Sequence, residues 1–253
     1  MSRDYNGTTS AINIGSGGAL DNAQPLTMAL WAAAETLGEG SSGNMIGKLS
    51  SDTSTGRLNF HVRKTAGGPL IYRFFKDWGN INMIAATTGN VAIADTNGVF
   101  HHVAFTWTGG STAATDIVFY VDGVETAHGQ DQNGSGSTNS DASLPLVIGN
   151  NGGGSRTFDG QICHVHVFRR VLSGNEIRQL MHHPASVKAA GGGIPVNTAG
   201  LLGYWPGNVF SAGVEVDQSG NQFRGVTTAA IASAKNPPVN EAFVMQTPGV
   251  PYW

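Results

Sequence analysis

The chain has 253 residues, a formal net charge of −3, 40% apolar residues and only 12% charged residues. This composition excludes a disordered chain, which would combine low hydrophobicity with high net charge. No Lys/Arg block is present, which excludes the basic face that nucleic-acid binding requires. The single cysteine, Cys163, excludes an internal disulfide framework.

The ends and the apolar runs of the chain bear on its location. No apolar run reaches the roughly 18 residues of a membrane helix, and the first residues lack the apolar core of a secretion signal. We therefore expect no membrane partner and synthesis in the cytoplasm. A protein without a secretion signal that works outside the cell must leave by another route, such as release on a particle. We therefore expect this protein on a virion surface or, after release, outside the cell.

Short segments that alternate apolar and polar residues recur along the chain, with connectors rich in Gly, Asn, Ser and Thr. Such alternation predicts β-strands at residues 11–15, 26–34, 44–50, 56–64, 69–75, 99–108, 115–123, 143–150 and 159–170. Many short strands with turn-rich links predict an all-β sandwich or barrel. Between the apolar runs of 120–125, Asp122-Gly123 predicts a tight hairpin turn.

One short helix is predicted over residues 172–183. Ser173 is a good N-cap, and Glu176 three residues later completes a capping-box pattern. Apolar residues follow at helical spacing, and Pro184 comes directly after the predicted end.

The C-terminal quarter has three parts. Residues 185–200 are small and Gly-rich and are interpreted as a linker, and residues 201–236 have strand character followed by a turn. Residues 237–253 hold four prolines and end in Tyr252 and Trp253. This composition predicts an extended tail whose terminal aromatic pair docks on its own domain or on a neighbouring subunit.

Four motifs in the middle of the chain resemble the laminin-G-like, or concanavalin A-like, jelly-roll domain. They are "FHHVAFTW", "FYVDGVE", "LVIGN" and "FDGQICHVHVFRRVLSGNEIRQL", and their order, spacing and closing helix match that family. The opening "RDYNGTTSAINIG" followed by "LTMALWAAA" is similar to the start of the family's domain. The resemblance implies a two-sheet antiparallel jelly-roll sandwich over residues 1–184, commonly a binder of glycans or proteins and often with a structural calcium.

The segment "LLGYWPGN…DQSGNQFRGV" resembles a piece that usually precedes this opening, but here it comes last. Residues 201–230 therefore either complete the same sandwich in permuted order or form an unfinished neighbouring unit. The family's acidic pair is replaced by Cys163 and His164, which removes a calcium ligand from that position. Cys163 alternates with Val165 and Val167, so we expect a buried thiol in the core.

The paired histidines have structural and functional interpretations. His101 and His102 point to opposite sides of one strand, so they are interpreted as features of the fold. His164 and His166 share a face, which favours a groove-facing or exposed pair, while a two-His metal half-site is the alternative.

For calcium, which needs hard oxygen ligands from loops, the main candidates are Asp122, Asp131, Asn133 and Asp141. Asp122 is explained more simply as the hairpin residue. For glycan binding, the candidates are Trp78, Asn80, His164 and His166, with Trp78 in an exposed-looking turn. Trp31 and Trp107 alternate with core residues and are expected to be buried.

Catalytic signals are weak. Glu215 and Asp217 lie two apart but lack the third acid of a glucanase strand, and no hydrolase or phosphate-loop motif is present. We expect a non-enzymatic protein with one of two functions. The first is a virion structural protein, such as a phage capsid-decoration or tail/fibre-associated protein that contacts other capsid subunits, self-associates and binds surface glycans. The second is a free, calcium-dependent or calcium-independent, carbohydrate-binding lectin-type module.

Overall fold

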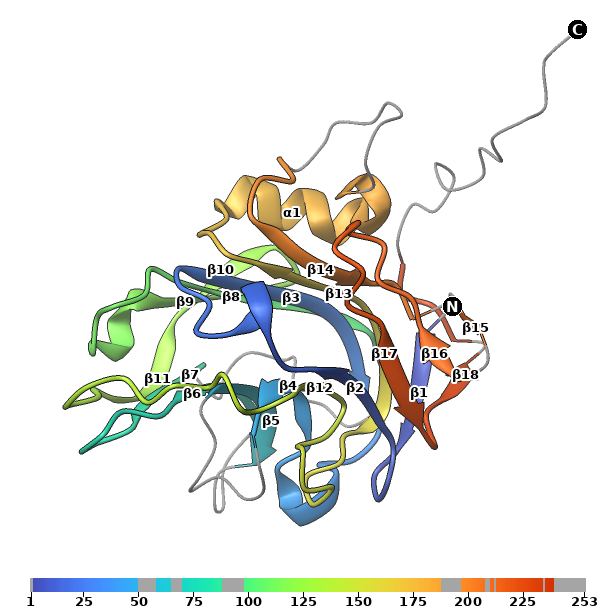
Figure 1. The fold of residues 1–253 in the computed structure, drawn as a ribbon, viewed down its shortest axis with the longest axis horizontal. Coiled ribbons are helices and arrows are strands. Elements are labelled where there is room, and N and C mark those ends of the chain that lie inside the picture. Colours follow the sequence, from blue (N-terminus) through green and yellow to red (C-terminus); the bar gives the residue numbers. More distant parts are fainter. Residues whose placement is uncertain are drawn as a thin grey trace, which may run out of the picture.

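The computed structural model describes residues 2–49, 58–64, 70–87, 98–187, 197–207, 210–211, 213–233 and 235–238. Two antiparallel sheets pack face to face, and one helix lies on the outside (Figure 1). The predicted two-sheet jelly-roll sandwich with a short helix is confirmed. No helix among these residues is long and apolar enough to span a bilayer.

The eight-stranded sheet has a seven-strand path, and an eighth strand, β14 (Leu201–Trp205), pairs with β13 beside it. Along the path the order is β10 (Val124–Thr126), β9 (Ile117–Val121), β8 (His101–Trp107), β3 (Leu26–Ala34), β13 (Asp159–Phe168), β1 (Ser2–Asn6) and β18 (Ile231–Ser233). The ten-stranded sheet has the order β11 (His128–Gln132), β7 (Met83–Thr87), β6 (Leu70–Lys76), β5 (Leu58–Lys64), β4 (Asn44–Lys48), β12 (Leu146–Ile148), β2 (Ala11–Gly15), β17 (Gly225–Thr228), β16 (Val214–Glu215) and β15 (Phe210–Ser211). Four 3-10 turns, η1 (Gly18–Leu20), η2 (Glu39–Ser41), η3 (Ala114–Asp116) and η4 (Pro184–Val187), lie in the connections.

The core lies between the two sheets and is rich in aromatic rings. Phe105 on β8 contacts Phe74 and Phe60 of the opposite sheet, with ring centroids 4.6 Å and 5.1 Å apart. Trp107 lies in this core and Trp31 is buried on the outer side of the same sheet, so both are buried, as the alternation predicts. Burial of this apolar area is the main favourable term in folding, and the aromatic pairs add offset and edge contacts.

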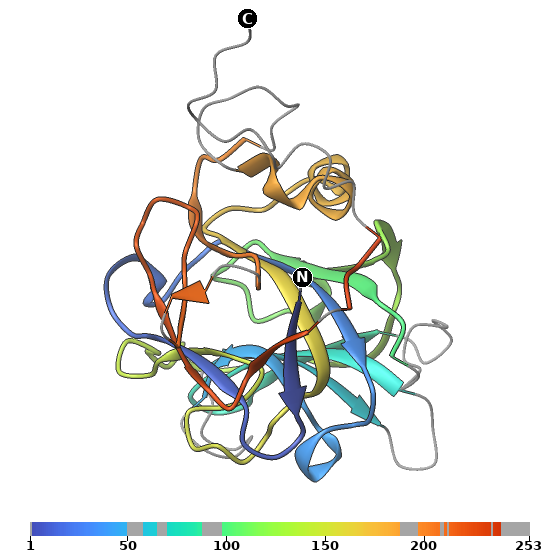
Figure 2. The same cartoon turned by 90° about the vertical axis from the view of Figure 1, so that its right-hand side faces the viewer.

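A second, smaller core lies on the outer face of the eight-stranded sheet, beneath α1 (Gly174–His182) (Figures 1 and 2). The capping box is present: the Ser173 hydroxyl accepts from the Glu176 amide, and the Glu176 carboxylate accepts from the Ser173 amide. Ile177 and Leu180 are buried against apolar residues of β3, β8 and β13. The helix therefore encloses the side chains that project outward from this sheet.

The C-terminal segment contributes strands to both sheets. β14 pairs with β13, β18 pairs with β1, and β17 pairs with β2. Figure 2 shows β18 and the β17 region beside the N-terminal strand. The described part of 201–236 therefore belongs to the same sandwich, whereas most of the predicted linker and the tail with Tyr252 and Trp253 lie outside the described residues.

A bulge in β13 changes which way Cys163 points. His164 has a φ of 48°, and the pairing of β13 with β3 shifts register between Cys163 and His166. Cys163 is buried, as predicted, but it pairs with Trp31 on the outer side of the sheet, while Ile162 and Val165 join the inner core. The expectation that Cys163 points the same way as Val165 is wrong, because the extra residue of a bulge reverses the alternation.

Candidate functional site: the polar loop edge

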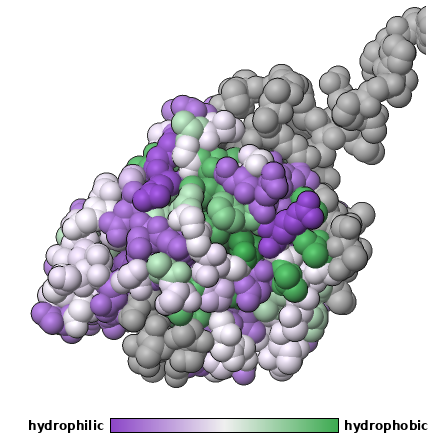
Figure 3. Space-filling view, in the orientation of Figure 1, coloured by the Kyte–Doolittle hydropathy of each residue, from purple (hydrophilic) through white to green (hydrophobic). Residues whose placement is uncertain are grey.

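Three loops at one end of the sandwich form the strongest candidate site. We call residues 77–82, 109–116 and 132–142 together the polar loop edge. Backbone hydrogen bonds join the first and third loops: the Gly79 amide donates to the Ser137 carbonyl over 2.8 Å, and the Asn80 amide donates to the Ser135 carbonyl over 3.0 Å. In Figure 3 the left end of the molecule, where these loops lie, is predominantly hydrophilic.

The second loop is tied to the third by two further bonds. The Gly134 amide donates to the Thr112 carbonyl over 2.8 Å, and the Asn133 side-chain oxygen accepts from the Ala114 amide over 2.9 Å. The exposed polar side chains of the edge are all amides or hydroxyls, namely Asn80, Thr115, Gln132, Asn133, Ser137, Thr138 and Ser140. The loops are thus held by backbone bonds and by the side chains of Gln132, Asn133 and Ser140, which bond to Asn82, Ala114 and Asn22. The side chains of Asn80, Ser137 and Thr138 are exposed on the surface of these loops.

Trp78 does not provide a stacking platform, which corrects the sequence-based expectation. Its side chain is only 5% exposed and belongs to the inter-sheet core. The third loop covers the indole so closely that a Cβ at Gly134 would lie 2.5 Å from Trp78 Cδ1. Trp78 therefore supports the loop edge from below, and of the predicted glycan residues only Asn80 is exposed there.

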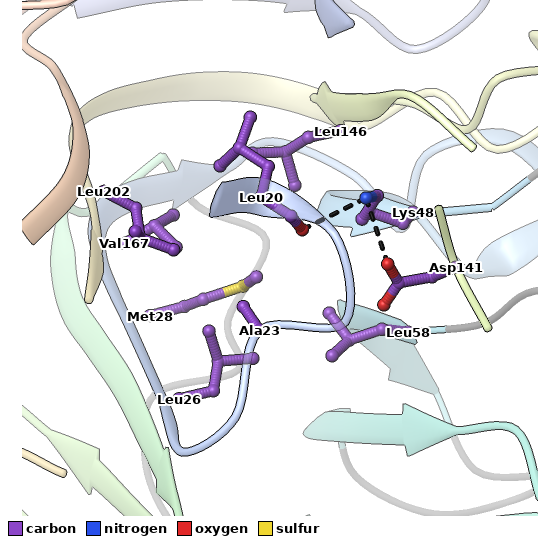
Figure 4. Close-up of a pocket in the computed structure, with 10 residues that line it drawn as sticks. All are labelled: Leu20, Ala23, Leu26, Met28, Lys48, Leu58, Asp141, Leu146, Val167 and Leu202. Carbon is purple, nitrogen blue, oxygen red and sulfur yellow. Dashed lines mark hydrogen bonds and ion pairs between the residues drawn. The ribbon is translucent and has the colours of Figure 1, made fainter. Parts of the chain in front are cut away.

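Asp141 is buried among lysines and does not fit a calcium site. Lys48 Nζ lies 3.0 Å from Asp141 Oδ1 and 2.6 Å from Asp21 Oδ1, and Lys76 Nζ lies 3.8 Å from Asp141 Oδ2. Figure 4 shows Lys48 donating to the Leu20 carbonyl and paired with Asp141, beside a small apolar cavity. The lysine ammonium groups already supply the positive charge that a cation would bring, so they exclude a divalent ion from this carboxylate.

The other predicted calcium ligands also have protein partners. Asp122 has a φ of 47° in the predicted hairpin turn, and its carboxylate accepts from the His101 ring and the His102 amide. Burial raises the pKa of Asp122, but these two hydrogen bonds outweigh it and lower the pKa overall. Asp131 pairs with the His128 ring at 2.8 Å. Because these oxygens serve separate loops and no group of three acidic, His or Cys side chains converges among the described residues, the predicted set does not fit calcium.

His164 and His166 are buried on the outer side of the eight-stranded sheet, so the expectation of an exposed or groove-facing pair is wrong. His164 Nδ1 lies 2.9 Å from the Tyr204 hydroxyl, and the His166 ring stacks on Tyr204 with centroids 4.4 Å apart. His166 Nε2 donates to the Pro184 carbonyl over 3.0 Å. The sequence places both on one side of the strand, but it does not show that Tyr204 of the neighbouring strand β14 and the Pro184 turn after α1 pack on that side.

His101 and His102 lie on opposite sides of β8, as predicted. His101 binds Asp122 near the sheet edge, and His102 is buried on the outer side, with its ring 5.5 Å from that of Trp31. Burial in an apolar site, with repulsion from His166, lowers the pKa of His102 to about 3. These positions give the pair a structural role at the hairpin and beneath the helix.

The acidic pair near the C-terminus also has structural partners. Glu215 is fully buried and pairs with Arg3 at 3.0 Å, and its other oxygen accepts from the Gly207 amide. Burial raises the pKa of Glu215, and the positive charge of Arg3 opposes this rise. Asp217 accepts from the Tyr204, Ser219 and Phe223 amides, so it organises a turn.

Two packed antiparallel sheets, a helix on one outer face and a polar loop edge define a lectin-like jelly-roll domain. The family model described as the concanavalin A-like lectin/glucanases superfamily, Laminin_G_3, matches residues 6–178. The chain belongs to this superfamily, as the resemblance implied. Comparison with curated proteins found no match for the chain.

Several solved structures share the fold. A candidate carbohydrate binding protein from Bacteroides ovatus ATCC 8483 is 16% identical with a TM-score of 0.64, over 94% of this chain and 61% of that protein. A heptameric SAP-like pentraxin from Limulus polyphemus is 13% identical with a TM-score of 0.52, over 89% and 93%. The enzymatically active domain of tailspike protein 2 from bacteriophage CBA120 is 15% identical with a TM-score of 0.51, over 79% and 28%. At these identities the likeness shows the fold alone.

Proposed function

We propose that this chain is a non-catalytic carbohydrate-binding module that contacts glycans through the polar loop edge. The observation that carries the proposal is the group of exposed amide and hydroxyl side chains on a backbone held by inter-loop hydrogen bonds. Amides and hydroxyls both donate and accept, which suits the hydroxyl groups of sugars. A loop that is already ordered by its own bonds loses less conformational entropy when a ligand binds.

Support also comes from the Bacteroides ovatus structure, which has the highest TM-score of those described here. Of the two functions expected from the sequence, the loop edge favours carbohydrate binding over a virion structural role. The reason is that its exposed amides and hydroxyls form a surface for glycans on the domain itself. The candidate acids Glu215 and Asp217 are committed to Arg3 and to backbone amides, which favours binding over hydrolysis.

We expect Thr138→Ala to weaken glycan affinity by about 3–10-fold, the effect of losing one ligand hydrogen bond. Asn80→Ala should have an effect of the same size, and the two together should abolish detectable binding. The measurement is a glycan-array screen followed by calorimetry with the strongest hit. Thr228→Ala on β17 makes the same chemical change, at an exposed position separated from β11 by six strands, and should leave affinity unchanged. Equal losses in the Thr138 and Thr228 variants would contradict the placement of the site.

A structural role on a phage particle is the second candidate, favoured by the likeness to the CBA120 tailspike domain. In that role the tail residues Tyr252 and Trp253 would dock on a neighbouring capsid or tail subunit. A full chain that binds no glycan on the array but sediments with phage particles, and loses this association when residues 239–253 are deleted, would replace the carbohydrate-binding proposal with this one.

A further inference from the structure

The loop edge lies in an unusually anionic part of the chain. No Lys or Arg occurs between Lys76 and Arg156, whereas the same stretch contains seven carboxylates, giving a formal charge of −7 with histidines neutral. The carboxylates are Asp77, Asp95, Asp116, Asp122, Glu125, Asp131 and Asp141. All three loops of the edge come from this stretch.

The two lysines nearest the loop edge cannot reach a ligand. Lys48 and Lys76 are 3% and 1% exposed, and both are paired with the buried Asp141. Lys76 Nζ also donates to the Asn139 carbonyl from below the third loop over 3.4 Å. The two ammonium groups therefore neutralise internal carboxylates and bond to the loop backbone.

Two carboxylates near the loop edge are accessible to solvent. Among the described residues of the edge, no exposed Lys or Arg neutralises their charge. Asp131 on β11 is exposed and pairs with the half-buried His128 ring, and Asp116 is half-buried in η3. Recognition of a carboxylate or sulfate on a sugar normally uses Arg or Lys, often as a bidentate contact. A like charge brought to this surface would instead be repelled and left without a partner.

We infer that the loop edge selects uncharged glycans and discriminates against glycans that carry a sialic acid, a uronate or a sulfate. This inference rests on the proposed glycan-binding function and adds the class of ligand. Amide and hydroxyl groups can satisfy sugar hydroxyls without a charged partner, whereas the acidic substituent would lose water and gain no cation.

The test compares matched glycan pairs, such as N-acetyllactosamine with its 3′-sialyl and 6-sulfated derivatives, within a panel of neutral glycans and their acidic counterparts. Affinities are measured on the full chain at about pH 8, where free histidine rings are neutral, and at low and high salt. The neutral member should bind at least about 10-fold more tightly at low salt, and the difference should narrow as salt screens the carboxylates.

A charge-adding variant gives an independent measurement. Ser137→Lys places a cation on the exposed third loop and should raise affinity for acidic glycans relative to their neutral partners by about 10-fold. Thr228→Lys adds the same charge on the remote strand β17 and should leave the ratio unchanged. Acidic glycans that bind as tightly as neutral ones to the unmodified chain would overturn the inference while leaving glycan binding intact. No binding to any member of the panel would overturn the proposed function and the inference with it.

Discussion

Lowering the pH from 7.5 to 5.0 should reduce the free energy of unfolding by about 4 kcal/mol, because two buried histidines stay neutral in the folded protein. Burial lowers the pKa of His102 to about 3, with repulsion from His166 and His182 adding to it and Asp122 opposing it. Burial also lowers the pKa of His166 to about 4, against the hydrogen bond to the Pro184 carbonyl. Neither ring can ionise at pH 5 without losing its place beneath α1.

The sign follows from proton binding in the two states. In the unfolded chain both histidines take up a proton below their usual pKa of about 6.5. Between about pH 6.5 and the depressed folded values the unfolded state therefore binds more protons, and stability falls as the pH falls. A pH of 5 lies about 1.5 units below the pKa of an unfolded histidine. Each buried ring therefore lowers the free energy of unfolding at pH 5 by about 2 kcal/mol. Carboxylates with lowered pKa values, such as Asp122, lose their contributions mainly below this range.

Urea unfolding at the two pH values measures the effect. His102→Leu should halve the pH dependence, and at pH 7.5 it should be neutral or stabilising, since neither ring nitrogen of His102 has a hydrogen-bond partner among the described residues. His183→Gln changes an exposed histidine at the end of α1 and should leave the dependence unchanged. A wild-type protein equally stable at both pH values would show that the rings are not buried as described.

Replacing Arg3 with Met should reduce the free energy of unfolding by about 3–5 kcal/mol, the usual cost of removing one partner of a buried ion pair. Arg3 Nε and Nη2 both donate to Glu215 Oε2, over 3.1 Å and 3.0 Å, and Nη1 donates to the Ala230 carbonyl. Without Arg3, the fully buried Glu215 keeps the Gly207 amide as a partner but loses its compensating charge.

The double variant Arg3→Met/Glu215→Leu provides the matched control. It removes both charges and should recover most of the stability, because a buried apolar pair avoids the desolvation of two ions. The ion pair joins β1 to the C-terminal segment, so the experiment also reports on whether residues 201–236 are part of one cooperative sandwich. A loss below about 1 kcal/mol for Arg3→Met would mean that this segment contributes little to the folded domain.

The fold could be predicted from the sequence wherever a local pattern and the tertiary contact agree. The alternation in 26–34 and 159–170 corresponds to β3 and β13, and the capping box of Ser173 and Glu176 starts α1. β11 falls within 127–143, which has no apolar alternation, and it forms because β7 offers an unpaired edge. A polar segment that becomes a strand by pairing with its neighbour has no apolar alternation that would predict it from its own residues.

The candidate site was less predictable for two physical reasons. Trp78 lies in a turn rich in Gly and Asn, but the third loop covers it, and this long-range contact has no local pattern. His164 and His166 share a side of β13, but they are buried there by Tyr204 of β14 and by the Pro184 turn, and no local pattern shows these contacts. The sequence predicts Asn80 as a glycan residue and Asn133 only as a calcium ligand. It gives no signal for Thr138, Ser137 and Gln132, because contacts between the loops bring them together.

The most direct test of the central claim is to map the amide chemical shifts of the full chain by NMR while the strongest glycan hit is added. The proposed function predicts that the largest shifts cluster in residues 77–82 and 132–142, with little change in β17 or α1. Shifts concentrated on another face of the sandwich, or confined to the tail after residue 238, would contradict the assignment of the polar loop edge as the binding site.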